Sequence, residues 1–204
     1  KTNRTTALMV FPMMTGMAMV ATLLMRVLLT EKWVPAAPFL QVLAVVYALY
    51  PMEAADLQAI NAIGRSDLYL KTEIIKKIFG ILALAAAVFL FTTPIATAYS
   101  AAITAVFSML VTMIVMKRLF FYRMRDQIWD MLPPMLLSGA MAAAVWGVSM
   151  ISMSDLASLI VQVVCGVAVY LGLAVLLKLK SLDYLVASIK DFFNRKKVNQ
   201  SNQD

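Results

Sequence analysis

Long apolar blocks separated by short polar segments are the feature that most constrains the fold of this chain. Four of these blocks cover residues 7–29, 95–116, 131–151 and 156–177. A bilayer core of about 30 Å needs about 20 apolar residues in an α-helix, and lipid offers no hydrogen bonds to an irregular backbone. The sequence therefore predicts an all-α integral membrane protein.

Two shorter blocks decide how many helices cross the membrane. Residues 39–52 and 78–91 carry no charged side chain over 14 residues each, a length that also fits re-entrant segments. If both blocks turned back, the basic segment between them would lie outside, against the usual excess of Lys and Arg in cytoplasmic loops. If both cross, residues 54–63 extend the first block, and Lys76 and Lys77 extend their ammonium groups to the interface. We therefore predict six spans, at about 7–29, 38–63, 74–93, 95–116, 131–151 and 156–177.

The basic residues also predict the orientation. With six spans, 16 of the 18 Lys and Arg residues lie on one side, while the outer loops hold Lys32 and the first span holds Arg26. This asymmetry predicts that the N and C termini are both cytoplasmic. The basic residues assigned to the inner side are Lys1, Arg4, Arg65, Lys71, Lys76, Lys77, Lys117, Arg118, Arg123, Arg125, Lys178, Lys180, Lys190, Arg195, Lys196 and Lys197.

Prolines and the C-terminal segment complete the architecture that we expect. Pro12 and Pro51 fall inside spans and are expected to kink them. Pro133 and Pro134 are expected in the first turn of the fifth span, where a missing amide donor costs little. Residues 179–193 place apolar side chains on one helical face and predict an amphipathic interfacial helix, followed by a disordered cytoplasmic tail over 194–204.

Composition excludes several classes of function. The chain is 62% hydrophobic and 14% charged, with no histidine and one cysteine, Cys165, inside an apolar block. This inventory excludes disulfide frameworks, His or Cys metal clusters and Ser-His or Cys-His catalytic pairs within the chain. The net charge of +7 comes from residues between membrane blocks, so it does not predict nucleic-acid binding. We expect neither enzymatic activity nor a cofactor or metal.

Glu53 and Asp56 are the acidic residues that lie within a predicted span, and their spacing places them on one helical face with Tyr50 and Asn61. Carboxylates at membrane depth are costly and usually mark an ion or substrate path, so coupling to protons or sodium is one interpretation. The other is structural, because both residues lie in the inner third of the helix, within reach of headgroup water and of Arg65.

Arg26 is the remaining candidate for a substrate path. Its position near the outer end of the first span would allow contact with a phosphate. We favour a structural role, in which its guanidinium reaches the outer headgroups or pairs with Glu31.

Two segments resemble a known family. The first is an outer turn, Thr30-Glu31-Lys32-Trp33 with Pro35, followed by Pro38-Phe39-Leu40-Gln41. The second runs from Leu57 and ends in an Asn-x-x-Gly-Arg-Ser/Thr-Asp element, here Asn61, Gly64, Arg65, Ser66 and Asp67. The pattern resembles polysaccharide repeat-unit flippases of the multidrug/oligosaccharidyl-lipid/polysaccharide exporter superfamily. The rest of the chain resembles that family in hydropathy.

The resemblance implies one six-helix lobe of a two-lobe alternating-access transporter in the bacterial cytoplasmic membrane. Because the chain begins at Lys1, we expect it to be a piece of a longer protein. The resemblance implies that it is the second lobe and that the N-terminal lobe of the same protein is its partner. The implied substrate is an oligosaccharide on polyprenyl pyrophosphate, for capsule, exopolysaccharide or lipopolysaccharide O-antigen synthesis. Membrane lipids and other polysaccharide assembly proteins are further expected partners. The family element also fits a structural turn, in which Asn61 and Gly64 end one helix and Asp67 accepts amides that open the next.

Two other functions fit the sequence. Paired carboxylates would suit a cation-coupled multidrug antiporter of the same superfamily, and a non-transporting membrane assembly subunit is the second alternative. The resemblance also leaves the phosphate site open, since the second span offers carboxylates and Arg26 is the basic residue within the first span. We expect the phosphates to be held by the other lobe or near Arg65.

Overall fold

The computed structural model describes residues 2–91, 93–120, 124–151 and 153–176, and within these ranges the chain is helical and contains no β-strand. The elements in chain order are α1 (Thr2–Leu24), a π-helical turn (Met25–Leu29), a 3-10 turn (Glu31–Ala36), α2 (Ala37–Ala62), α3 (Ser66–Leu90), α4 (Ile95–Phe120), α5 (Met124–Ser149) and α6 (Asp155–Leu176).

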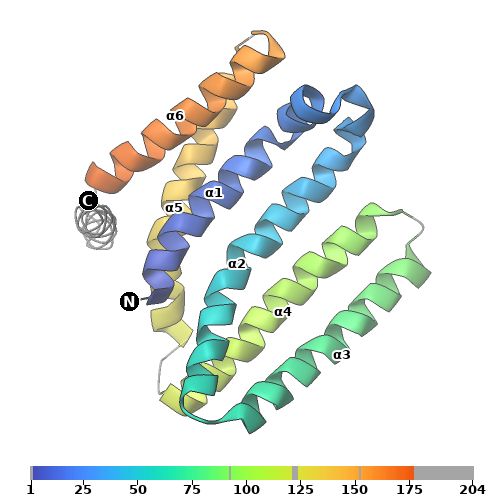
Figure 1. Ribbon diagram of the computed structural model, residues 1–204, viewed down its shortest axis with the longest axis vertical. Coiled ribbons are helices and arrows are strands. Elements are labelled where there is room, and N and C mark those ends of the chain that lie inside the picture. Colours follow the sequence, from blue (N-terminus) through green and yellow to red (C-terminus); the bar gives the residue numbers. More distant parts are fainter. Residues whose placement is uncertain (1, 92, 121–123, 152, 177–204) are drawn as a thin grey trace, which may run out of the picture.

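The helices run up and down in sequence order, so that α1 begins and α6 ends at the same end of the bundle (Figure 1). α1 packs against α2, α5 and α6, whereas α4 packs against α2 and α3. The turn between α2 and α3, the last residues of α4 and the first residues of α5 lie at the end where α1 begins (Figure 1). Arg65 and the Lys117–Arg118 pair near the end of α4 therefore share that end, as the predicted orientation requires.

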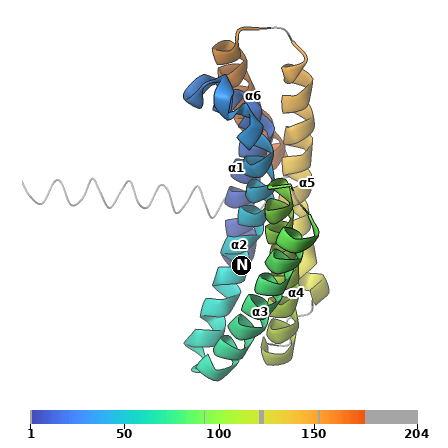
Figure 2. The ribbon, with the colours of Figure 1, turned by 90° about the vertical axis from the view of Figure 1, so that its right-hand side faces the viewer.

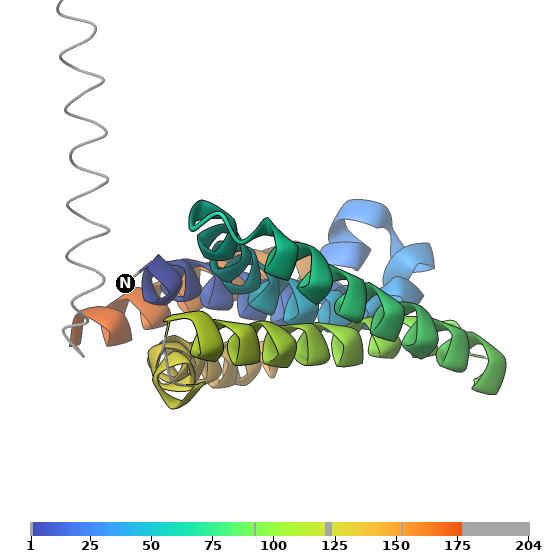
Figure 3. The same cartoon turned by 90° about the horizontal axis from the view of Figure 1, so that it is seen from below.

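The bundle has two sides. Viewed from the side, α4 and α5 lie on one side, and α1 and α2 lie on the other (Figure 2). Viewed along the bundle, α2 and α3 lie on the same side of α4 (Figure 3). α3 has extensive contact with α4 and little with α2. Its contact with α4 includes Phe79 and Phe107, whose stacked rings have centroids 3.8 Å apart.

The described helices confirm an all-α integral membrane protein. Five helical stretches are long and apolar enough to cross a membrane, namely Thr5–Leu29, Glu31–Ala62, Ile95–Phe120, Met131–Ser149 and Asp155–Leu176. α3 is 25 residues long but is not among the five, and its first half carries Glu73, Lys76 and Lys77. Its crossing of the membrane, and with it the sixth span, stays a prediction.

Helix α5 corrects the expectation for Pro133 and Pro134. The helix begins at Met124, so the two prolines lie in its interior and not in its first turn. Its first turns carry Arg125, Asp126, Gln127 and Asp130, which interrupt the apolar pattern before residue 131. The predicted interfacial helix over 179–193 and the tail over 194–204 lie outside the described residues.

Pro12 lies inside α1, and its missing amide explains a buried contact. Proline cannot donate to the carbonyl four residues earlier, which here is that of Leu8. The hydroxyl of Tyr170 in α6 donates to the Leu8 carbonyl oxygen at 2.6 Å. Both side chains are buried in a cluster that joins the two helices to Leu137, Met141 and Val145 of α5. Tyr170 thus supplies the hydrogen bond that the helix lacks.

We predict that Tyr170→Phe destabilises the protein by about 1–3 kcal/mol, because it leaves a buried carbonyl without a donor. The loss should be smaller in a Pro12→Ala background, where the amide of residue 12 bonds to Leu8 within α1. Unfolding of the detergent-solubilised full chain, followed for the four proteins of this double-mutant cycle, measures the coupling. Equal losses in the two backgrounds would contradict this account of Tyr170.

Candidate functional site

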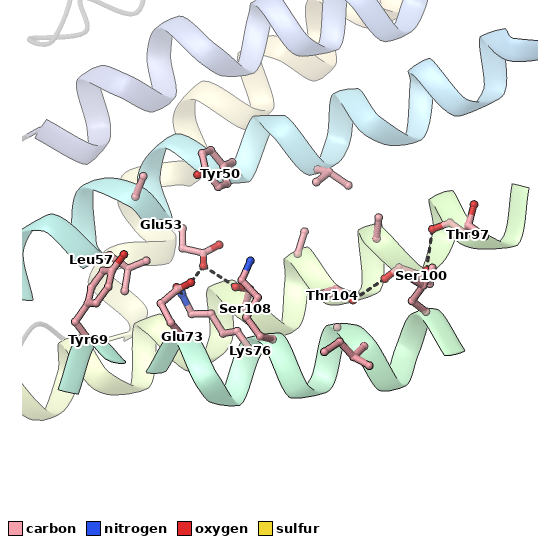
Figure 4. A pocket seen from close by; sticks show the side chains of 18 of the residues that line it. Tyr50, Glu53, Leu57, Tyr69, Glu73, Lys76, Thr97, Ser100, Thr104 and Ser108 are labelled. Atoms are coloured by element: carbon pink, nitrogen blue, oxygen red, sulfur yellow. Dashed lines mark hydrogen bonds and ion pairs between the residues drawn. The ribbon is translucent and has the colours of Figure 1, made fainter. Parts of the chain in front are cut away.

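A half-open cavity of about 570 Å³ lies among α2, α3 and α4. Polar side chains from all three helices face it, and small residues such as Gly80 and Ala101 leave it room. Figure 4 shows that α4 places its hydroxyl-bearing side chains toward this space, with Tyr50 on α2 and Tyr69 on α3. The polar lining residues are Tyr50, Glu53, Gln58, Tyr69, Glu73, Lys76, Lys77, Thr97, Ser100, Thr104 and Ser108.

A buried ion cluster lies within the cavity lining. The Lys76 ammonium donates to Glu53 Oε1 at 2.6 Å and to Glu73 Oε1 at 2.9 Å (Figure 4). Ser108 of α4 donates its hydroxyl to the same Glu53 oxygen at 2.5 Å. The side chain of Lys76 is 5% exposed and that of Glu53 is 11% exposed. Three helices therefore meet at one carboxylate.

This cluster corrects the expectation that Lys76 reaches the membrane interface. Its ammonium is held inward by two carboxylates, because an ion in an apolar bundle is far less costly when it is paired and hydrogen-bonded. Lys77 is exposed, and it also lines the cavity. The two carboxylates and two ammonium groups of the lining give it no net formal charge.

The predicted acidic face of α2 is divided in the structure. Tyr50 and Glu53 line the cavity, whereas Asp56 and Asn61 do not. Asp56 is 8% exposed and follows Ala48 and Met52 at four-residue intervals. Ala48 and Met52 pack against Ala7 and Phe11 of α1. The three-residue spacing placed Glu53 and Asp56 near one another on the helix, but of the two only Glu53 lines the cavity.

The family-like element forms the turn between α2 and α3. The amide of Arg65 bonds to the Ile60 carbonyl, and that of Gly64 to the Asn61 carbonyl. Gly64 has φ +74°, so the turn is a Schellman motif with glycine in the left-handed position. Ser66 begins α3.

Arg65 and Asp67 close this turn with an ion pair. Arg65 Nε donates to Asp67 Oδ1 at 3.1 Å, and this hydrogen bond lowers the pKa of the exposed Asp67 carboxyl. The backbone amide of Leu68 also hydrogen-bonds to that carboxyl and lowers its pKa further. The residues of the family element therefore make an ordered structural turn at one end of the bundle.

Arg26 lies away from the cavity, on the π-helical turn after α1. Its Nη1 donates to Asp155 Oδ1 at 3.3 Å, and its Nε lies 3.9 Å from Glu31 Oε1. The expected pairing with Glu31 is thus present, but the contact with Asp155 is closer. Arg26 ties the end of α1 to the start of α6.

The cavity also contains residues that sequence reasoning missed. Glu73 lies just before the predicted span at 74–93, and the α4 row Thr97, Ser100, Thr104 and Ser108 lies within the predicted apolar span at 95–116. The spacing of three and four residues in that row is a signal for one helical face. It did not show that α2 and α3 would cover this face. In the described part of the chain, no three His, Cys, Asp or Glu residues are placed to hold a metal ion.

The fold and the cavity define an all-α integral membrane protein with a charged, hydroxyl-lined cavity. A family model described as a polysaccharide biosynthesis protein matches residues 1–38, which cover α1, the connection to α2 and the first residues of α2. The chain is therefore similar over this segment to polysaccharide biosynthesis proteins. No curated protein and no solved structure matches the chain.

We predict that Lys76→Met destabilises the protein by about 3 kcal/mol, because it leaves the nearly buried Glu53 and the partly exposed Glu73 without their cation. Combining it with Glu53→Gln should restore much of this loss, since one of the two unpaired charges is then removed. Glu53→Gln alone should cost less, because Lys76 keeps Glu73 and the Gln oxygen still accepts from Ser108. Thermal unfolding of the full chain in detergent ranks the three variants. A double variant as unstable as Lys76→Met would contradict the cluster's role.

Proposed function

We propose that this chain is a lobe of a flippase that moves polyprenyl-pyrophosphate-linked oligosaccharides across the bacterial cytoplasmic membrane for surface polysaccharide synthesis. The observation that carries the proposal is the polar cavity among α2, α3 and α4. Charged and hydroxyl side chains at membrane depth are costly and mark substrate or ion paths. The chain acts here as a transporter and not as an enzyme.

Two similarities support polysaccharide synthesis as the process. The family match over residues 1–38 supports it at the start of the chain, and the Asn61 to Asp67 element supports it at the α2–α3 turn. A six-helix lobe with both ends in the cytoplasm would pair with an N-terminal lobe, so that the saccharide passes between the lobes and the lipid tail stays in the bilayer. Other polysaccharide assembly proteins are the partners that would supply and receive the substrate.

Deleting the gene should cause lipid-linked repeat units to accumulate in the cytoplasmic leaflet, because their synthesis continues while export stops. The full-length protein, supplied in trans, should restore export. The measurement is extraction of the lipid-linked saccharides together with their accessibility to a periplasmic glycosidase. Normal leaflet distribution in the deletion strain would refute the proposed transport. Accumulation in the periplasmic leaflet would indicate a role in later assembly, as for a non-transporting subunit.

A cation-coupled multidrug antiporter is the second candidate, and one observation favours it. Glu53 places a carboxylate at the wall of the cavity, where a proton or sodium ion would exchange with a cationic substrate. Lys76 already occupies this carboxylate and lowers its attraction for a second cation. The flippase is therefore the better supported function.

Glu53→Gln separates the two functions. In an antiporter the substitution should abolish drug efflux, because the exchanging carboxylate is lost, and saccharide export should be unaffected. In a flippase that does not depend on this carboxylate for coupling, drug sensitivity should stay unchanged. Minimum inhibitory concentrations of cationic dyes and the surface polysaccharide content of the same strains measure both. Asp56→Asn is a matched control, because Asp56 does not line the cavity.

A further inference from the structure

The hydroxyl row of α4, defined as Thr97, Ser100, Thr104 and Ser108, runs along the floor of the cavity. Each hydroxyl already uses its hydrogen within the protein. Thr97 donates to the Pro94 carbonyl and Ser100 to the Thr97 carbonyl. Thr104 donates to the Ser100 carbonyl, and Ser108 donates to Glu53. The lone pairs of these oxygens remain as acceptors.

The ion cluster adds acceptors to the same space. An ionised carboxylate has about four acceptor positions. The bonds made by Glu53 and Glu73 to Lys76 and Ser108 engage Oε1 of each carboxylate. Lys76 directs two of its three N–H groups to these carboxylates, so its charge is compensated within the wall. The ammonium of Lys77 also lines the cavity, so two carboxylates and two ammonium groups leave the lining without net positive charge for an anion. The hydroxyl row and the carboxylates make the cavity rich in acceptors.

The balance of hydrogen-bond donors and acceptors in the cavity favours one part of a lipid-linked saccharide over another. A diphosphate carries acceptor oxygens and negative charge. It would meet the ammonium of Lys77 beside two carboxylates of like charge, so the lining as a whole gives it no net attraction. A neutral sugar ring carries several hydroxyl donors, which match the hydroxyl row and the free carboxylate oxygens.

Aromatic side chains complete this match. Tyr50 is 61% exposed on α2, Tyr69 lies on α3 and packs against the cluster that contains Leu57, and both tyrosines line the cavity (Figure 4). Their rings offer apolar surface to the C–H face of a sugar and a hydroxyl at the tip. Gly80, whose added Cβ would lie 3.2 Å from Thr104 Cγ2, keeps α3 close to the row.

We infer that this cavity binds the neutral sugar rings of the lipid-linked saccharide through the hydroxyl row, Glu53 and Tyr50, while the diphosphate stays outside it. The inference rests on the proposed flippase function, and it names the part of the substrate that this lobe recognises. The sugar rings bind at the hydroxyl row through hydrogen bonds and stacking alone.

Substitutions test the row against a matched position on the same helix. Ser100→Ala and Thr104→Val remove one acceptor each from the cavity and should raise the substrate concentration for half-maximal export by about threefold to tenfold each. Thr112→Val is the control, because the Thr112 hydroxyl donates to the Ser108 carbonyl and does not line the cavity. Tyr50→Leu should weaken binding similarly, whereas Tyr47→Leu, at an exposed position outside the lining, should not.

Cysteine protection identifies which part of the substrate occupies the row. Thr104→Cys is placed in a Cys165→Ala background of the full-length protein and labelled with N-ethylmaleimide in inverted membrane vesicles. One set of vesicles comes from cells that make the complete lipid-linked repeat unit. The other set comes from cells without the initiating sugar-phosphate transferase, whose polyprenyl phosphate carries no sugar. Inorganic pyrophosphate and tetraphenylphosphonium are added to the second set as probes. Ile103→Cys, exposed on the same helix outside the lining, is the labelling control.

We expect labelling at position 104 to slow by about threefold or more in vesicles with the complete saccharide, as occupancy requires. Labelling at position 103 should not change. Protection by pyrophosphate, or in vesicles without the sugar, would overturn the inference in favour of a phosphate site. Protection by tetraphenylphosphonium alone would overturn it in favour of a cation site.

Complementation separates this inference from the proposed function. The Thr104→Cys protein is expressed in the deletion strain, and export of lipid-linked units is measured in the same cells. Restored export without protection at position 104 would overturn the sugar site while the flippase function stands. Failure of the unsubstituted full-length protein to restore export would remove the proposed function and this inference with it.

Discussion

Every polar group that lies at membrane depth needs a partner inside the protein, because hydrocarbon supplies none. This constraint explains the long helices, since an α-helix satisfies its own backbone. It also explains the contacts where a helix cannot do so. Pro12 leaves the Leu8 carbonyl without its usual donor, and Tyr170 replaces that donor from another helix. The packing of α6 on α1 is therefore specified by a hydrogen bond as well as by apolar contact.

The same constraint places the charges of α2 and α3. Lys76 and Glu53 come from helices with little other contact, and their ion pair lies against Ser108 of α4. Charge compensation leaves an open space that is polar yet has no net formal charge. Such a space is suited to a ligand with many hydroxyl groups and little charge, which links the packing of α2, α3 and α4 to the proposed saccharide headgroup.

The positions of the helices could be predicted well from the sequence, because hydropathy and charge are local properties of the chain. The predicted block at 95–116 lies within α4, and the block at 38–63 coincides closely with α2. Prediction from the sequence failed where the environment of a residue depends on another helix. Lys76 was assigned to the interface because sequence shows the length of its side chain but not Glu53 across the cavity. Pro133 was expected at a helix start because charged residues such as Asp126 and Asp130 interrupt the apolar pattern in the turns that open α5.

The sequence by itself determined the class of fold, the approximate ends of the helices and the gathering of basic residues at one end, since hydropathy and charge act along the chain. Only the tertiary structure decided which residues form the cavity. It separated Asp56 from Glu53, added Glu73, Lys76 and the hydroxyl row of α4, and placed Arg26 beside Asp155. The physical reason is that residues far apart in sequence become neighbours through the rotation and pairing of whole helices, and the apolar pattern of a membrane helix, nearly uniform around its axis, does not encode that rotation.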